Sequence, residues 1–207
     1  GGDDGGYEMK CHTGSKTTFG DWQADFYIYF RRGQDCRFPE FERDDFLQTF
    51  GKKSEKKEGR YSWSGEPAPK IHSFNDYGQK LEVNRDDNIL ALYSYSEDKR
   101  ENKSSIIPYN EMKTENLVLA RWDHNTLKQK LEKKFNQHGW FKCLKDSSNI
   151  YRGIIFGPPM NYELFISYVK TGDIYFDSGM YSGNPRPYAM WRADNRFWDS
   201  MVIERYP

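Results

Sequence analysis

The sequence predicts a mixed α/β domain in which strands outnumber helices. Short segments with alternating or aromatic-rich side chains predict the strands, and two segments with apolar residues at helical spacing predict helices. Aromatic residues make up 17% of the chain, which is enough to build a core and argues against disorder. The length of 207 residues suits one large domain, or one domain with a small appended lobe.

The first half of the chain is expected to consist mainly of strands and loops. Residues 6–12 (GYEMKCH) have alternating side chains and lie between glycines and a turn. Residues 25–30 (DFYIYF) are rich in aromatic side chains. The expected elements, in order, are strands at 6–12 and 25–30, a short helix at 44–50, a charged solvated loop at 51–60, a long irregular stretch at 61–79, and a hairpin of 80–84 with 89–96.

The second half alternates strands with helices. Leu127, Leu131 and Phe135 recur at a spacing of four, which predicts a helix that Asp123 caps and that runs to about Gln137. The expected elements are a strand at 117–122, that helix, strands at 140–144 and 151–156, a helix at 161–170, a strand at 174–176, and a tail at 177–207 rich in arginine, aromatic residues, glycine and proline.

Composition excludes several classes of protein. No apolar run approaches the roughly 20 residues that a membrane span needs, and the first six residues lack the basic and apolar regions of a signal peptide. The formal net charge is +0, whereas a protein that coats nucleic acid without specificity would usually be basic.

Cys11, Cys36 and Cys143 are widely spaced, which indicates reduced thiols rather than a zinc site. We therefore expect a cytoplasmic protein.

Asp3, Glu8 and Lys10 form the first candidate site. On a strand, Glu8 and Lys10 project to the same face, because side chains alternate with a period of two. Hydrolysis of a phosphodiester needs a divalent metal held by carboxylates, and it benefits from a cation that positions the attacking water. Asp3 and Glu8 would hold the metal and Lys10 would address the water. Asp4 is an alternative to Asp3, and His12 lies on the same face if the strand continues.

A competing triplet with the same letters occurs at Glu111–Lys113. Ile106 stands where an upstream acid would be needed, and Pro108 interrupts any strand leading to the triplet. We expect Glu111 and Lys113 to be structural or exposed. The alternative for Glu8 and Lys10 is a surface ion pair on an exposed strand face.

The tail carries a second candidate set, which would read DNA bases. Arginine can donate to both O6 and N7 of guanine, and aspartate can accept from N4 of cytosine. The alternative is a surface loop whose arginines stack on aromatic rings. A third feature is the helix face with Lys128, Lys130, Lys133 and Lys134, which could follow phosphates but is more often simply solvated.

Several long strings resemble the MvaI/BcnI family of type II restriction endonucleases, and in particular its LlaMI-like branch. These strings follow the family's order from Gly6 to about Ser200: GYEMK, KTTFGDW, RYSWSGEP, FNQHGWFKC, FDSGMYSGN, RPY and WRA. The resemblance implies a MutH-like fold, which is a mixed β-sheet flanked by helices with a restriction-endonuclease-like PD-(D/E)xK core.

The resemblance also implies residues and partners. It implies Mg²⁺ as cofactor, Asp3, Glu8 and Lys10 as catalytic residues, and Asp177, Arg186 and Arg192 as base-reading residues. It implies a monomer that binds double-stranded DNA at short GC-bordered sites of the CCNGG kind, in a system with a cognate DNA methyltransferase. Lys16 is a further candidate for DNA binding.

Two departures from the family pattern bear on these expectations. Relatives carry a stretch before the catalytic aspartate, whereas Asp3 is here the third residue, so the chain is expected to lack part of an N-terminal lobe. Some relatives place an arginine two residues after the base-reading aspartate, where this chain has Gly179. We expect a single endonuclease domain over 1–207, in which 1–122 holds the catalytic strand and 123–207 the DNA-reading region. The alternatives are a MutH-like nickase of mismatch repair, a catalytically inactive DNA-binding module, and an α/β domain unrelated to nucleic acid.

Overall fold

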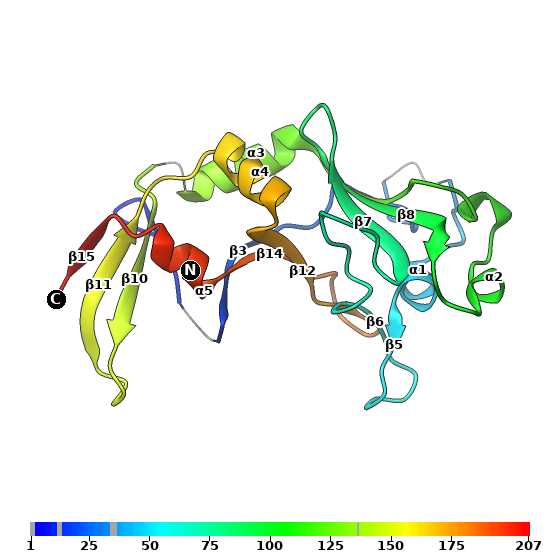
Figure 1. Ribbon diagram of the computed structural model, residues 1–207, viewed down its shortest axis with the longest axis horizontal. Coiled ribbons are helices and arrows are strands. Elements are labelled where there is room, and N and C mark those ends of the chain that lie inside the picture. Colours follow the sequence, from blue (N-terminus) through cyan, green and yellow to red (C-terminus); the bar gives the residue numbers. More distant parts are fainter. Residues whose placement is uncertain (1–2, 12–13, 34–36, 136) are drawn as a thin grey trace. The chain divides into compact units, whose positions relative to one another are not determined.

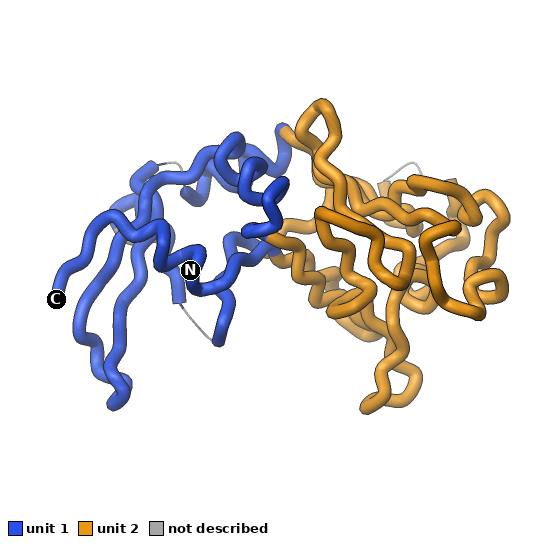
Figure 2. The backbone as a smooth tube through the Cα atoms, viewed as in Figure 1, with its two compact units in different colours: residues 1–20, 125–174, 191–207 blue, residues 21–124, 175–190 orange. Residues whose placement is uncertain are grey.

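The structure, a computed structural model, describes residues 3–11, 14–33, 37–135 and 137–207, with Asp3 and Asp4 described by their backbone alone. The chain divides into two compact units whose segments alternate along the sequence (Figure 2). Unit 1 comprises residues 1–20, 125–174 and 191–207, and unit 2 comprises residues 21–124 and 175–190. Each half of the sequence therefore contributes to both units.

Unit 1 contains a five-stranded mixed sheet of order β1-β2-β10-β11-β15 (Figure 1). Its strands are β1 (Asp3–Asp4), β2 (Tyr7–Met9), β10 (Trp140–Lys145), β11 (Tyr151–Gly157) and β15 (Glu204–Tyr206). Strand β2 runs parallel to β10, and the other neighbours are antiparallel. Strand β2 thus lies between β1 and the long hairpin of β10 and β11.

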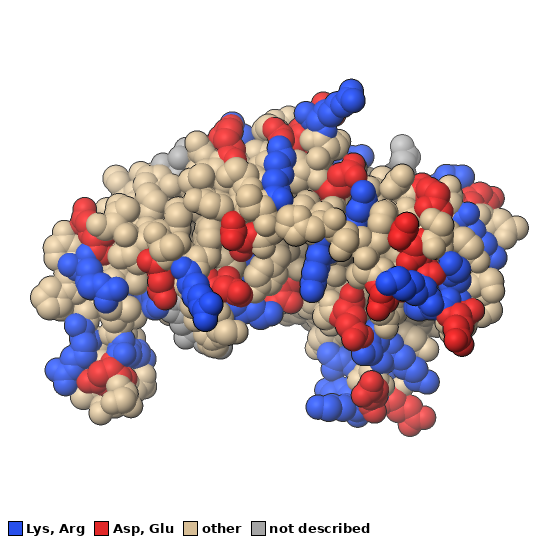
Figure 3. Space-filling model, in the orientation of Figure 1, with Lys and Arg blue, Asp and Glu red and all other residues tan. Residues whose placement is uncertain are grey.

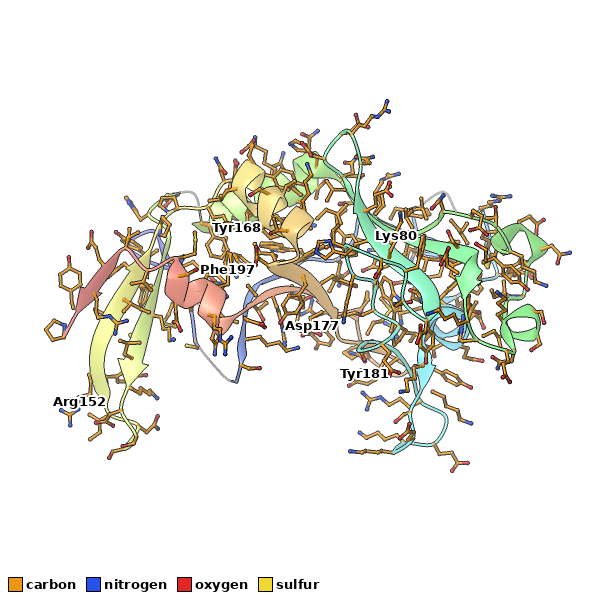
Figure 4. The ribbon with its side chains drawn as sticks, in the orientation of Figure 1. Lys80, Arg152, Tyr168, Asp177, Tyr181 and Phe197 are labelled. Carbon is orange, nitrogen blue, oxygen red and sulfur yellow. The ribbon has the colours of Figure 1, made fainter. Side chains whose placement is uncertain are left out.

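Three helices complete unit 1, and aromatic side chains form its core. The helices are α3 (His124–Phe135), whose first residue belongs to unit 2, α4 (Tyr162–Thr171) and α5 (Asn195–Ser200). Phe19 is fully buried, and its ring centroid lies 4.3 Å from that of Trp198 and 5.7 Å from that of Phe135. Tyr168 of α4 packs edge to face on Phe197 of α5, with ring centroids 4.8 Å apart (Figure 4).

Gly139 precedes β10, and its conformation accounts for the glycine in one of the unusual strings, FNQHGWFKC. Its φ of 92° lies in the left-handed region that favours glycine. A Cβ atom there would collide with the backbone carbonyl of Gly157. The carbonyl of Gly139 accepts a hydrogen bond from the N–H of Glu8 at 3.0 Å, so this turn also fixes the start of β2.

Unit 2 is built on a four-stranded antiparallel sheet and a smaller three-stranded sheet. The larger has the order β4-β9-β8-β7, and the smaller β13-β6-β5. The elements are β4 (Phe26–Tyr27), α1 (Arg43–Phe50), β5 (Lys52–Lys53), β6 (Tyr61–Trp63), β7 (Tyr77–Val83), β8 (Ile89–Asp98), α2 (Lys103–Ile106), the 3-10 helix η1 (Asn110–Met112), β9 (Leu117–Trp122) and β13 (Met180–Tyr181).

Buried rings and one buried amide join the elements of unit 2. The indole of Trp63 packs on Phe46 of α1 and on Phe176, with centroid distances of 5.1 and 5.3 Å. Gln79 is fully buried, accepts from the indole N–H of Trp63 at 2.6 Å, and donates to the carbonyl of Phe50 at 2.7 Å. A buried amide with both ends paired avoids the cost of lost solvation and fixes α1 against β6 and β7.

A third sheet has the order β12-β14-β3, and the boundaries between the two units fall within its strands. These strands are β3 (Lys16–Asp21), β12 (Ile174–Ser178) and β14 (Ala189–Asp194). Asp21 at the end of β3 and Ala189 at the start of β14 both belong to unit 2.

The mixed α/β class is confirmed, and most expected elements are present. Helix α1, the hairpin of β7 and β8, strand β9, and helices α3 and α4 lie within a few residues of their expected bounds. Helix α4 begins after Asn161, whose side-chain oxygen accepts from the N–H of Leu164. The charged loop expected at 51–60 contains β5 and the connection to β6, and Figure 3 shows lysine, arginine and acidic side chains together over it.

Some expectations were wrong. Only Phe26–Tyr27 of the strand expected at 25–30 is a strand, although the N–H of Ile28 still donates to Leu119 at 2.9 Å. The irregular stretch expected at 61–79 contains β6 and the start of β7, and β3 was not expected at all. Strands of two or three residues are too short to show a period, so long-range pairing decides them. None of the helices in the part of the chain described here could cross a lipid bilayer.

Candidate catalytic site and DNA-reading loop

Glu8 and Lys10 share the buried face of one strand. They expose 3% and 5% of their surface, whereas Met9 between them exposes 36%. The backbone N–H of Lys10 donates to Phe141 of β10 at 2.8 Å, which holds the extended conformation past the end of β2. The alternation expected from the sequence is confirmed, and the pair is not a surface ion pair.

Each N–H donor of the Lys10 ammonium group has an acceptor. Its Nζ atom lies 3.1 Å from Oε1 of Glu8, 2.8 Å from the carbonyl oxygen of Thr18 and 3.2 Å from that of Phe19. It also lies 4.6 Å from the ring centroid of Phe135. Three acceptors match the three donors of an ammonium group, so the side chain is held in one position.

Lys134 reaches the same carboxylate from helix α3. Its Nζ atom lies 2.8 Å from Oε1 of Glu8 and 3.2 Å from the carbonyl oxygen of Phe19. Of the two interpretations of this helix face, simple solvation does not hold for Lys134. Lys128 on the same helix instead pairs with Glu163 at 3.2 Å, while Lys133 is exposed.

The two lysines and the burial set the charge state of the site. Burial acts to raise the pKa of Glu8, but the charges and hydrogen bonds of Lys10 and Lys134 outweigh it and leave that pKa below its usual value. Burial, assisted by the charge of Lys134, lowers the pKa of Lys10 to about 7, although Glu8 opposes the shift. Glu8 is thus ionised at neutral pH.

The backbone brings Asp3 opposite Glu8. In the antiparallel pair of β1 and β2, Asp3 is the partner of Glu8, and Asp4 is the partner of Tyr7. Gly5 and Gly6 make the connecting turn with φ values of 58° and 82°, as two-residue hairpin turns require. Among residues whose side chains are described, no three histidine, cysteine, aspartate or glutamate residues form a metal-binding group. His12 lies outside the described residues.

The competing triplet lies in a different setting. Glu111 is exposed within η1, and Lys113 follows this short helix rather than lying on a strand. Met112 between them is fully buried. The exposure of Glu111 agrees with the expectation that Glu111 and Lys113 are structural or exposed.

The expected base-reading residues are divided between the two units. Asp177 (β12, labelled in Figure 4) and Arg186 belong to unit 2, whereas Lys16 (β3) and Arg192 (β14) belong to unit 1. Asp177, Lys16 and Arg192 are half-buried. Nη2 of Arg186 lies 2.6 Å from Oδ2 of Asp21, and its guanidinium carbon lies 4.5 Å above the ring centroid of Tyr188.

Sequence reasoning missed the roles of two backbone carbonyls and two side chains at these sites. The carbonyl oxygens of Thr18 and Phe19 could not be found from the sequence, because every residue carries a carbonyl. Lys134 was named, but with another role. Asp21 was not singled out, although it lies within the unusual string KTTFGDW.

Comparisons with known proteins agree with this architecture. Residues 2–206 match the family model of the LlaMI restriction endonuclease. The type II restriction enzyme ScrFI of Lactococcus lactis subsp. cremoris is 43% identical over 214 residues, covering 96% of this chain and 79% of ScrFI.

Two solved structures share the fold at low sequence identity. Restriction endonuclease MvaI without DNA has a TM-score of 0.50 at 16% identity, covering 99% of this chain and 79% of MvaI. MvaI in complex with its cognate DNA substrate has a TM-score of 0.52 at 14% identity, covering 97% of this chain and 77% of MvaI. The resemblance drawn from the sequence strings is confirmed, and the chain belongs to the LlaMI restriction endonuclease family.

Proposed function

We propose that this restriction endonuclease hydrolyses both strands of double-stranded DNA at a short GC-bordered site of the CCNGG kind, with Mg²⁺ as its cofactor. The identity of 43% to a type II restriction enzyme supports this specialised role over mismatch-repair nicking. We further propose that it acts as a monomer in the bacterial cytoplasm, where its DNA would lie, and that a cognate methyltransferase protects the host sites.

The observation that carries the proposal is the buried carboxylate of Glu8 between two lysines. A carboxylate and an ammonium rarely lie so far from water unless they are paired, and an unpaired charge there would be costly. A structural role would need one partner, whereas Glu8 receives both Lys10 and Lys134 at the same oxygen. Such a concentration of charge at one strand end is typical of a site that handles a charged substrate.

The residues present fit a magnesium ion. Mg²⁺ prefers oxygen ligands and is usually held by one or two carboxylates, with water and substrate phosphate completing its shell. Glu8 supplies one ionised carboxylate, and the register that pairs Asp3 with Glu8 favours Asp3 over Asp4 as the second. When bound, the ion would neutralise phosphate charge and make a bound water more acidic.

Lys10 and Lys134 of unit 1 would position the reacting groups and offset their charge. Lys10 is anchored by the carbonyls of Thr18 and Phe19, so its ammonium would be positioned before the substrate arrives. We assign to it the offset of charge developing on the phosphate, and, with Glu8 engaged by the ion, the donor that Lys10 gives to Oε1 of Glu8 would be free to orient the attacking water. Lys134 would hold Glu8 ionised and in place.

We propose that base recognition rests on Arg186, Arg192 and Asp177, the two arginines reading guanine and the aspartate reading cytosine. Side chains with this donor and acceptor geometry match the edges of G·C pairs. Pro185 and Pro187 on either side of Arg186 restrict the backbone and lower the cost of holding the side chain in place.

Cleavage of a plasmid with a single CCNGG site tests the proposal. We expect linear plasmid with Mg²⁺, intact plasmid with EDTA, and intact plasmid with Mg²⁺ when the site is absent. Nicked circles as the final product would favour the mismatch-repair nickase. Binding to the site without any cleavage would identify an inactive DNA-binding module.

A further inference from the structure

We infer that Asp21 is a positioning residue for base recognition: its carboxylate holds the Arg186 guanidinium in the orientation from which this arginine reads a guanine. The inference rests on the proposed role of Arg186. All the residues that carry it belong to unit 2.

The Asp21 carboxylate is itself fixed by the backbone. Its Oδ1 atom accepts from the N–H of Ala189 at 2.8 Å, and the next residue, Trp22, donates its N–H to the carbonyl of Ala189 at 2.9 Å. The Asp21 side chain is only 23% exposed. One carboxylate oxygen therefore anchors the group, which leaves the other to point at Arg186.

Two contacts fix the plane of the Arg186 guanidinium. Oδ2 of Asp21 lies 2.6 Å from Nη2, and the ring of Tyr188 lies beneath the guanidinium carbon at 4.5 Å. A planar guanidinium carries five donors, so an ion pair at Nη2 leaves others for a base edge. The side chain is 50% exposed, which is consistent with a group presented to a ligand.

The loop that carries Arg186 is anchored on both sides. Before it, Asn184 is 2% exposed, and its carbonyl accepts from Nη2 of Arg43 at 2.6 Å. After it, the carbonyl of Tyr188 accepts from the N–H of Gly179 at 3.1 Å. A Cβ atom on Gly179 would lie 3.1 Å from Cβ of Tyr188. Glycine at 179 thus leaves Tyr188 its place under Arg186 without a close contact from a Cβ atom.

The ion pair has a second interpretation, in which Asp21 sequesters Arg186 from DNA. The two differ in their consequences. A positioning carboxylate lowers the cost of ordering the arginine at the base, so its loss reduces discrimination between sites. A sequestering carboxylate competes with DNA, so its loss strengthens binding to every sequence alike.

The experiment uses Asp21→Asn in the full chain, because the amide oxygen can still accept from the N–H of Ala189 while the charge is lost. Dissociation constants are measured in EDTA on a CCNGG duplex and on duplexes with one G·C pair changed. We expect discrimination at one G·C pair to fall about 10-fold, within the range of a lost bidentate contact. In the Arg186→Ala background, Asp21→Asn should cause no further fall, because the two act as a unit.

Two further variants complete the design. Asp76→Asn is the matched control, because Asp76 forms an exposed ion pair with Lys99 in the same unit, at 2.8 Å, and should leave discrimination unchanged. Asp21→Glu keeps the charge but moves it by one methylene, and should restore part of the discrimination. Asp21→Glu also replaces Asp21→Asn as the test if the asparagine variant does not fold.

The outcomes separate the inference from the proposal beneath it. If Arg186→Ala leaves discrimination intact, the proposed role of Arg186 fails. If Arg186→Ala reduces discrimination but the Asp21 variants do not, the role of Asp21 fails alone. The role of Asp21 would also be overturned if Asp21→Asn reduced discrimination equally in the parent protein and in the Arg186→Ala background. Tighter binding of Asp21→Asn to all duplexes would overturn it as well.

Discussion

Lys134 and Lys10 donate to the same oxygen of Glu8. Their Nζ atoms lie 2.8 and 3.1 Å from Oε1, and both also contact the carbonyl of Phe19. Two ammonium groups so close repel each other, and the carboxylate between them offsets that repulsion. Removal of any of the three charges should therefore affect the site as a whole.

Lys10→Ala should abolish cleavage while leaving DNA binding largely intact. Loss of one fixed charge-stabilising group costs about 100- to 1000-fold in rate in comparable sites. Rates are measured on plasmid with Mg²⁺, and binding by gel shift in EDTA. Cleavage comparable to the parent enzyme would refute the role assigned to Lys10.

Lys134→Gln should slow cleavage by about 10-fold or more, because a charged hydrogen bond to Glu8 is replaced by a neutral one. Lys133→Gln is the matched control, since Lys133 is exposed on the same helix. Equal rates for the two variants would show that Lys134 contributes only general positive charge.

Gly139→Ala should destabilise the protein by about 1–3 kcal/mol, because the new methyl group meets the Gly157 carbonyl at a left-handed position. Gly183→Ala is the control, since Gly183 has a φ of 85° but open space around it. Denaturant unfolding followed by tryptophan fluorescence measures both. Equal losses of stability in the two variants would mean that the collision is relieved without cost. The close packing at Gly139 would then not constrain the start of β2.

Arg186→Ala and Arg192→Ala should each lose about 1–3 kcal/mol of discrimination between a CCNGG duplex and duplexes with one G·C pair changed. An arginine that contacts only phosphate would weaken binding to every sequence equally. If both variants lose affinity equally on all duplexes, the base-reading residues lie elsewhere, for example in the aromatic stretch from Tyr61 to Tyr77.

The sequence predicted the local contacts of the proposed catalytic site better than its long-range contacts. Alternation alone placed Glu8 and Lys10 on one face, and the Gly5–Gly6 turn accounts for an upstream acid opposite Glu8. The approach of Lys134 depends on where α3 packs, which helical spacing does not determine. The spacing identified Leu127, Leu131 and Phe135 as the buried face, and all three are buried.

In the tail, too, local sequence patterns did not predict long-range contacts. Its arginines and prolines were recognised as a candidate loop, but β13 and β14 are strands because of their partners in space rather than their own pattern. Asp21 lies more than 160 residues from Arg186 in the chain. No spacing rule connects residues that far apart, so their ion pair required the structure.

The most direct test of the proposed catalytic site compares Glu8→Gln with Glu111→Gln on one plasmid that carries a single CCNGG site. Both variants remove one carboxylate charge from the same three-letter string, Glu-Met-Lys. Rates are measured with Mg²⁺, and circular dichroism confirms folding. We expect no linear plasmid with Glu8→Gln and parental cleavage with Glu111→Gln. Parental cleavage with Glu8→Gln, or its loss in a folded Glu111→Gln protein, would contradict the assignment of the catalytic strand.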